Sequence, residues 1–178
     1  EMSASLVGSE MCIRDSNSKY PQNEKVVYKM GDSFVCQNAK FTITDTYMLK
    51  RMDIMNDDDL SEYLEENSDY LKSEDLNLGL IKIIISNTTD DEITVDLTAF
   101  HIESGAFSLQ FYYPLVMYYN DCGMYIKLSK GEQKTFIAPV PISSEQFLNY
   151  DSTDIRNRTY YLVSSLYPQK IMSEVKFN

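Results

Sequence analysis

Residues 80–99 read LIKIIISNTTDDEITVDLTA, with two apolar segments on either side of a polar one. Its first six residues form an almost unbroken apolar run, which is typical of a central strand covered on both faces. The polar residues 87–91 come next and predict a turn. From 93 to 99 apolar and polar residues alternate, which indicates a strand with one face in the core. The stretch therefore predicts two β-strands joined by a short turn.

Short runs of the same type occur along most of the chain. The expected strands cover 26–28, 34–36, 41–45, 107–111, 124–128, 135–140, 159–164 and 172–177. Turns are expected at Asn38-Ala39 and at Lys130-Gly131, the second inside a hairpin. Pro114 restricts its own run to an edge strand or a bulge. The pattern predicts a mainly all-β protein, an antiparallel β-sandwich of about seven to nine strands.

One segment has a helical period instead. Apolar residues in 57–72 recur three and four positions apart, which predicts one inserted α-helix at about 58–72. Asp57, Asp58 and Asp59 stand at its start, where carboxylates meet the positive end of the helix dipole. Lys72 stands near its other end, where a cation is favoured.

Length and charge limit the classes of function. The chain has 178 residues and a formal net charge of -11, which suits one domain with a sizeable core. An acidic surface repels phosphates, so nucleic acid and anionic lipid are not expected partners. No window approaches 18 apolar residues, so no transmembrane segment is expected. Residues 57–75 hold nine acidic side chains against Lys72 alone, so one segment carries most of the charge.

The first sixteen residues stand apart from the rest. Residues 5–16, SLVGSEMCIRDS, resemble a translated sequencing adapter, so 1–16 are expected to be a non-native segment. Residues 17–24 are polar and predict a linker. The domain is expected to span 25–178, and the native start of the protein is expected to be missing.

The order of signals resembles a known group of domains. The motifs are VYKMGD at 27–32, the strand and acidic turn at 83–96, and the turn KGE at 130–132 that leads to Pro139 and Pro141. They resemble immunoglobulin-like domains of unknown function in envelope lipoproteins and secreted proteins of Gram-positive gut bacteria. The resemblance implies a β-sandwich outside the cell membrane, tethered by an N-terminal lipid or anchor. The chain has no Trp, so the Cys–Trp–Cys core of antibody domains is absent.

Few residues offer catalytic or metal chemistry. His101 is the single histidine, and a Ser–His–Asp triad would need a nucleophile that no Gly-x-Ser-x-Gly motif supplies. We expect His101 to be a strand-end side chain that bonds locally, beside Glu103. One histidine and few cysteines disfavour a tetrahedral zinc site, and no EF-hand spacing is present. No cofactor or metal is expected.

Two cysteines remain once Cys12 is set aside with the adapter-like segment. Cys36 and Cys122 could form a disulfide in an oxidising location. Two separate buried thiols are the alternative.

Two surface groups are candidates for binding. The first is an acidic face for a basic partner, and the second is a tyrosine surface that could stack on sugars or fill a protein interface. Solvated helix charge and ordinary core packing are the respective alternatives. The acidic residues are Asp57, Asp58, Asp59, Glu62, Glu65, Glu66 and Asp69, and the tyrosines are Tyr112, Tyr113, Tyr118 and Tyr119.

The sequence as a whole predicts an extracellular, envelope-anchored immunoglobulin-like module that binds or spaces a protein or cell-wall glycan and has no catalytic activity. The alternative is an enzyme, or an enzyme-inhibiting domain, with its site in loops near His101.

The envelope hypothesis makes a prediction about the source gene. The DNA upstream of the Asn17 codon is expected to encode a cleavable signal or a short apolar segment that ends in a cysteine. Sequencing that region tests the hypothesis directly. An initiator methionine just before Asn17 would contradict it.

Overall fold

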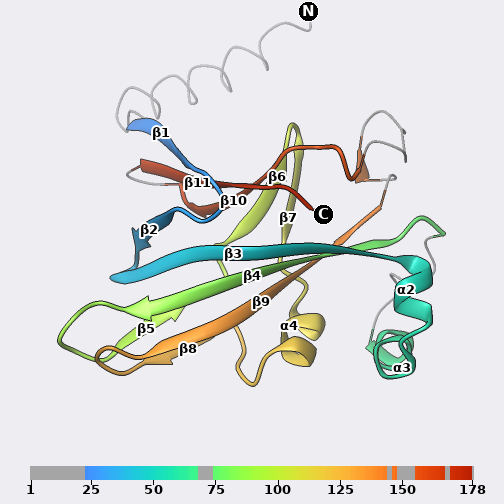
Figure 1. The fold of residues 1–178 in the computed structure, drawn as a ribbon, viewed down its shortest axis with the longest axis horizontal. Helices are drawn as coiled ribbons and strands as arrows, with labels where there is room; N and C mark the ends of the chain where they lie inside the picture. Colours follow the sequence, from blue (N-terminus) through green and yellow to red (C-terminus); the bar gives the residue numbers. More distant parts are fainter. Residues whose placement is uncertain (1–22, 68–73, 144–145, 148–154, 167–168, 178) are drawn as a thin grey trace, which may run out of the picture.

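The computed structural model describes residues 23–67, 74–143, 146–147, 155–166 and 169–177, which form two facing β-sheets (Figure 1). The strands are β1 (Asn23–Tyr28), β2 (Ser33–Cys36), β3 (Ala39–Lys50), β4 (Asn77–Asn87), β5 (Ile93–Asp96), β6 (His101–Ser104), β7 (Phe107–Gln110), β8 (Tyr125–Leu128), β9 (Gln133–Ile142), β10 (Tyr160–Ser165) and β11 (Gln169–Val175). The helices are α2 (Arg51–Met55), α3 (Asp58–Asn67) and α4 (Tyr113–Tyr119). A mainly β sandwich is therefore confirmed.

Two facing sheets and a separate two-stranded sheet make up the sandwich. One sheet has the order β1-β11-β10-β6-β7, the second has the order β2-β3-β4-β9, and β5 pairs with β8. All the pairs are antiparallel except β1 with β11, which is parallel. The described residues thus hold eleven strands and one parallel pair, where the sequence predicted about seven to nine antiparallel strands. A pairing between the two ends of the chain leaves no mark on local alternation, so the pattern alone missed it.

The main core lies between the sheets and is rich in aromatic rings. Tyr28 of β1 lies 5.5 Å from Phe34 of β2 between ring centroids, which joins one sheet to the other. Phe34 stacks on Phe41 at 5.2 Å. Gly79 of β4 leaves room for Phe177, because a Cβ there would come within 2.7 Å of that ring. The close approach makes glycine necessary at this point of a central strand.

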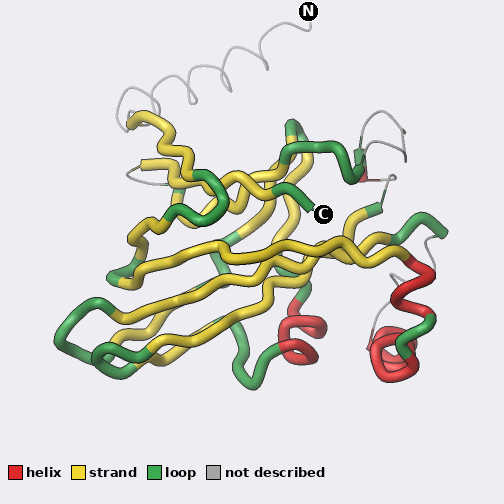
Figure 2. Tube along the Cα trace, viewed as in Figure 1, coloured by secondary structure: helices red, strands yellow, loops and turns green. Residues whose placement is uncertain are grey.

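β4 confirms the prediction of a central strand, because it lies between β3 and β9. Ile81, Ile83 and Ile85 face the main core. Leu78 and Leu80 point the other way, into a second cluster with Ile54, Leu60 and Leu64 of the helices. Figure 2 shows the three helices grouped toward the same end of the molecule, where they cover this outer face. The apolar run is therefore buried on both faces only along its first part.

Several turns differ from the expected ones. The β2–β3 hairpin turns at Gln37-Asn38 and not at Asn38-Ala39, with φ of 50° and 62° at the two residues. Two successive left-handed residues match the twist of a two-residue hairpin. β5 ends at Asp96, whose carboxylate accepts hydrogen bonds from both the N–H and the hydroxyl of Thr98. β8 and β9 flank the expected Lys130-Gly131 turn but pair with β5 and β4, so they form no hairpin.

The helices also differ from the prediction. Residues 113–119 form α4, where the sequence predicted an edge strand or bulge at Pro114, because proline fits the first turn of a helix. α2 was not expected at all. α3 confirms the predicted acidic helix from Asp58 to Asn67, and its expected continuation to residue 72 lies outside the described residues. β1 begins at Asn23, inside the predicted linker 17–24.

The side chain of Asn87, at the end of β4, links this strand to the β5–β8 pair. Its Nδ2 donates to the carbonyls of Asp91, Leu128 and Ser129 at 2.7, 3.1 and 3.0 Å. Asn87→Asp keeps the shape but sets a carboxylate against three carbonyl oxygens. We expect a loss of roughly 2–3 kcal/mol in the free energy of unfolding, measured by urea denaturation at neutral pH.

The same change at exposed Asn157 is the matched control for Asn87→Asp. We expect Asn157→Asp to shift the free energy of unfolding by less than about 0.5 kcal/mol. Similar losses in the two variants would contradict the role assigned to Asn87.

Candidate functional site

The acidic part of the candidate site is α3. Leu60 and Leu64 are buried in the second cluster and fix which side of the helix faces outward. The N–H of Leu60 donates to Oδ1 of Asp57 at 3.1 Å, which starts the helix. Six carboxylates remain exposed, and among the described residues none of them is in an ion pair. They are Asp57, Asp58, Asp59, Glu62, Glu65 and Glu66, whereas Asp69 lies outside the described residues.

The structure brings the tyrosine group up against this helix. Tyr63 of α3 lies 5.0 Å from Tyr118 of α4 between ring centroids, and its hydroxyl donates to the carbonyl of Pro114 at 2.8 Å. Tyr118 also meets Tyr119 edge to face at 5.0 Å. The two candidate surfaces predicted separately from the sequence are therefore one surface. Three of the four predicted tyrosines, Tyr112, Tyr118 and Tyr119, are half-buried against the second cluster, whereas exposed Tyr113 lies beside Gly123 and is not brought into this surface.

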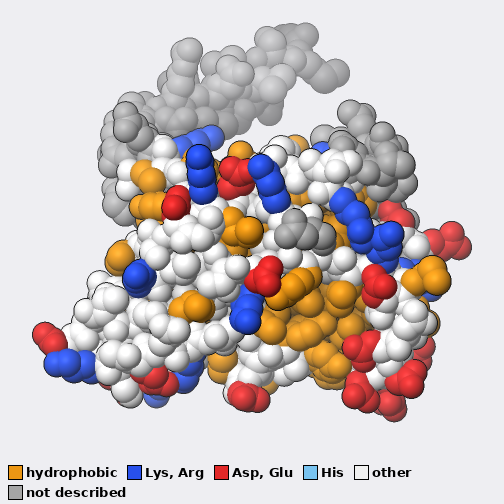
Figure 3. Space-filling model, in the orientation of Figure 1, with side chains coloured by type: hydrophobic (Ala, Val, Ile, Leu, Met, Phe, Trp, Pro, Cys, Tyr) orange, Lys and Arg blue, Asp and Glu red, His pale blue; other side chains and the backbone are white. Residues whose placement is uncertain are grey.

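An apolar patch continues from α4 onto the outer face of the sheet. Exposed Tyr47 and half-buried Leu49 lie on β3, and half-buried Ile137 lies on β9. Figure 3 shows this patch as one continuous orange area over β3, β4, β9 and α4, with the red carboxylates of α3 beside it. We call the patch, together with the exposed carboxylates of Asp57 and of α3, the acid–aromatic face.

The pKa values of two tyrosine hydroxyls are raised by burial and by the nearby negative charge. Burial raises the pKa of Tyr118, and the carboxylates of Asp57 and Asp59 raise it further. Burial, Tyr118 and Asp57 likewise raise the pKa of Tyr119. Both groups are therefore neutral hydrogen-bonding phenols across the physiological range.

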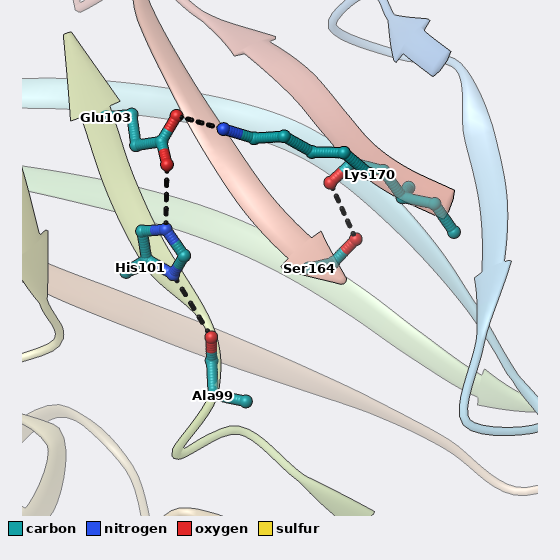
Figure 4. A network of polar contacts seen from close by, with 6 residues as sticks. Ala99, His101, Glu103, Ser164 and Lys170 are labelled. Atoms are coloured by element: carbon teal, nitrogen blue, oxygen red, sulfur yellow. Dashed lines mark hydrogen bonds and ion pairs between the residues drawn. The ribbon is translucent and has the colours of Figure 1, made fainter. Parts of the chain in front are cut away.

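His101 begins β6 and belongs to a different, polar network on the outer face of the other sheet (Figure 4). Its Nε2 lies 3.1 Å from Oε1 of Glu103, and its Nδ1 lies 3.2 Å from the carbonyl oxygen of Ala99. Lys170 of β11 donates to Oε2 of Glu103 at 2.6 Å, across β10. The hydroxyl of Ser164 turns to the carbonyl of Ile171 and not to the imidazole. Both ring nitrogens are thus engaged in local contacts.

Glu103 is the charged centre of this network. Its partial burial favours the neutral acid, but the hydrogen bonds from Lys170 and His101 outweigh burial and hold the pKa of Glu103 below its ordinary value. The arrangement ties β6 to β11 over the intervening strand.

The two cysteines are free thiols, so the disulfide left open by the sequence is not formed in this structure. The Sγ of Cys36 approaches the carbonyl of Ser164 at 3.5 Å, and Cys122 lines a surface pocket of about 500 Å³ with Tyr119 and Lys134. Burial raises the pKa of both thiols. Each acts as a half-buried small side chain.

The described part of the chain has neither a metal-ligand cluster nor a helix that could span a membrane. No group of three or more His, Cys, Asp or Glu side chains is placed to hold a metal ion there. No helix in those residues is long and apolar enough to cross a bilayer.

Comparison with known proteins places the chain in a family. The profile of a family described as "Domain of unknown function (DUF5028)" matches residues 17–171. The chain belongs to the DUF5028 family. Among curated proteins, none matches this DUF5028 chain.

Two solved structures are similar to the DUF5028 domain. The yjhA protein of Bacillus subtilis has 12% sequence identity and a TM-score of 0.44, over 85% of this chain and 99% of that one. An uncharacterised β-sandwich protein of Clostridium difficile has 13% identity and a TM-score of 0.42, over 86% of this chain and 97% of that one.

Sequence reasoning missed part of the acid–aromatic face of this DUF5028 domain. The helix α4 was overlooked because its run was interpreted as strand, and Tyr47 because alternation does not say which outer positions stay uncovered. One available signal was Pro114 followed by Leu115, Val116 and Tyr119, a proline at the start of a helical apolar stripe.

The Glu103 network predicts a pH dependence of stability. A carboxyl whose pKa is lower in the folded state stabilises the fold above its unfolded pKa, and this contribution is lost as pH falls through the folded pKa. The window therefore lies below about pH 4.5, near the ordinary value for glutamate.

Urea denaturation of the wild type and Glu103→Gln from neutral pH to about pH 3 tests this prediction. We expect the variant to be less stable at neutral pH, and the difference to shrink as pH falls through the window. A difference that stays constant with pH would contradict the charged role of Glu103.

Proposed function

We propose that this DUF5028 domain is a non-catalytic binding module, an extracellular immunoglobulin-like sandwich anchored to the bacterial envelope through a segment that precedes Asn17. A protein or cell-wall component docks on its acid–aromatic face. The observation that carries the proposal is the contiguity of an exposed apolar patch with a cluster of exposed carboxylates.

Apolar side chains that stay in contact with water cost free energy. Large apolar side chains kept at the surface in one patch indicate a contact surface more often than chance scatter does. Tyr47 is 43% exposed, and half-buried Leu49, Tyr118 and Ile137 continue the patch around it. Tyrosine offers wide contact area with few rotatable bonds, so it is suited to both protein and sugar surfaces. The anchoring part of the proposal is supported by the resemblance in motif order to envelope lipoprotein domains.

The non-catalytic part of the proposal is supported by the contacts of His101. The imidazole is held between Glu103 and the carbonyl of Ala99, and the nearby Ser164 hydroxyl is bonded elsewhere. A general base needs a nitrogen within reach of a substrate or nucleophile proton. These contacts favour a structural role for the histidine.

The docking surface can be tested by substitution. The probe is a preparation of isolated envelopes from a Gram-positive bacterium that carries a DUF5028 gene. We expect the purified full chain to co-sediment with the envelopes, and Tyr47→Ala/Tyr118→Ala to reduce the bound fraction at least about tenfold, since interface aromatics dominate binding energy.

The control removes two exposed apolar side chains elsewhere on the surface. Val35 on β2 and Tyr125 on β8 are 61% and 63% exposed, at the end of the molecule away from α3 (Figure 1). Val35→Ala/Tyr125→Ala is expected to bind as the wild type does. Equal losses in both double variants, or no binding by the wild type, would overturn the proposed docking surface.

A further inference from the structure

The charges of α3 do not follow the usual pattern of a helix built for stability. Glu62 is three or four residues from Asp58, Asp59, Glu65 and Glu66, so like charges are neighbours along one side. Glu65 and Glu66 stand in the last turn, where the helix dipole favours cations, and the last turn contains no basic residue. Each of these placements is unfavourable to the isolated helix.

Elsewhere in the domain, carboxylates form ion pairs with lysines. Glu103 is bonded to Lys170 at 2.6 Å, Glu174 is paired with Lys176 at 2.8 Å, and Asp90 is paired with Lys130 at 2.6 Å. The exposed carboxylates of α3 have no such cation among the described residues. The uncompensated charge is thus concentrated beside the apolar patch, and a partner with positive charge would complete it.

We propose that the occupant of the acid–aromatic face is a cationic segment of another protein, in which Lys or Arg residues are interspersed with apolar or aromatic ones. The inference rests on the docking function proposed above and names its partner. Basic side chains pair with Glu62, Glu65 and Glu66, while the apolar side chains contact Tyr47 and the α4 tyrosines. A second copy of this chain is disfavoured as occupant, because each copy has a net charge of -11.

The spacing of the carboxylates suggests the form of that segment. Glu62 and Glu66 are one helical turn apart, which is about 5–6 Å along the axis. Alternate side chains of an extended chain are about 6.6 Å apart and point to the same side. An extended segment with basic and apolar residues in alternation therefore presents one row to α3 and the other to the patch.

The test uses the full chain and two synthetic peptides of about twelve residues. One alternates Lys with Leu and Tyr, and the other has Ser in place of each Lys. By isothermal titration at about 20 mM NaCl we expect the cationic peptide to bind and the neutral one not to. At about 150 mM NaCl the affinity should fall at least about tenfold, because salt screens exposed charges.

Two variants of equal net charge separate local docking from general attraction. Glu62→Lys/Glu65→Lys/Glu66→Lys should abolish binding of the cationic peptide. Asp90→Lys/Asp91→Lys/Glu92→Lys changes three exposed acids of the β4–β5 turn and should retain binding within about threefold. Far-ultraviolet circular dichroism confirms that both variants are folded.

The outcomes are distinct from those of the docking test. Equal loss in both charge variants overturns the inference, because only net charge would then matter. Binding of the neutral peptide alone, or of neither peptide, also overturns it. If Tyr47→Ala/Tyr118→Ala still lowers envelope binding in that case, docking stands with a neutral partner such as a glycan. If the wild type binds neither envelopes nor peptide, both proposals fail.

Discussion

β4 has apolar side chains on both faces of its first half, and the other elements are arranged to bury them. Its isoleucines at 81, 83 and 85 need the opposite sheet, and its leucines at 78 and 80 need a second cover. The helices supply that cover only as far as half-exposed Lys82 and Ile84, where the outer face opens to solvent. Since α2 and α3 follow β3 directly and α4 packs against β9, the position of the acid–aromatic face results from the need to cover Leu78 and Leu80.

α3 is helical despite the repulsion between its carboxylates, and the size of the opposing free energies shows why. Like charges three or four residues apart cost about 0.2–0.5 kcal/mol per pair, so the four pairs around Glu62 amount to roughly 1–2 kcal/mol. Burial of Leu60 and Leu64 contributes about 1.5–3 kcal/mol each. The free energy gained by burying the two leucines therefore exceeds the repulsion between the carboxylates. The helix can keep an acidic outer side that helix propensity alone does not favour. Tertiary contacts of this kind are what stabilise most short helices.

Local patterns predicted those elements whose sequence keeps one period over several residues. β2, β3, β4 and the start of α3 were predicted because alternation, apolar continuity and helical period each persist over several residues. α4 was missed because proline was weighed as a strand breaker, while its use at a helix start depends on the residues after it. The parallel β1–β11 pair and the contact of Tyr63 with Tyr118 join residues far apart in sequence, so no local period contains them.

The domain has two charged regions that differ in whether their carboxylates are paired within the fold. Glu103 accepts hydrogen bonds from Lys170 and His101, so its negative charge is satisfied within the sheet and stabilises the joining of β6 to β11. The α3 carboxylates face solvent beside apolar side chains, and their field acts outward at distances up to a Debye length, about 8–10 Å. Both regions contain carboxylates, but only the second retains charge and apolar area that another molecule can use. A partner that pairs with those carboxylates also relieves their mutual repulsion, so binding and the stability of α3 are coupled.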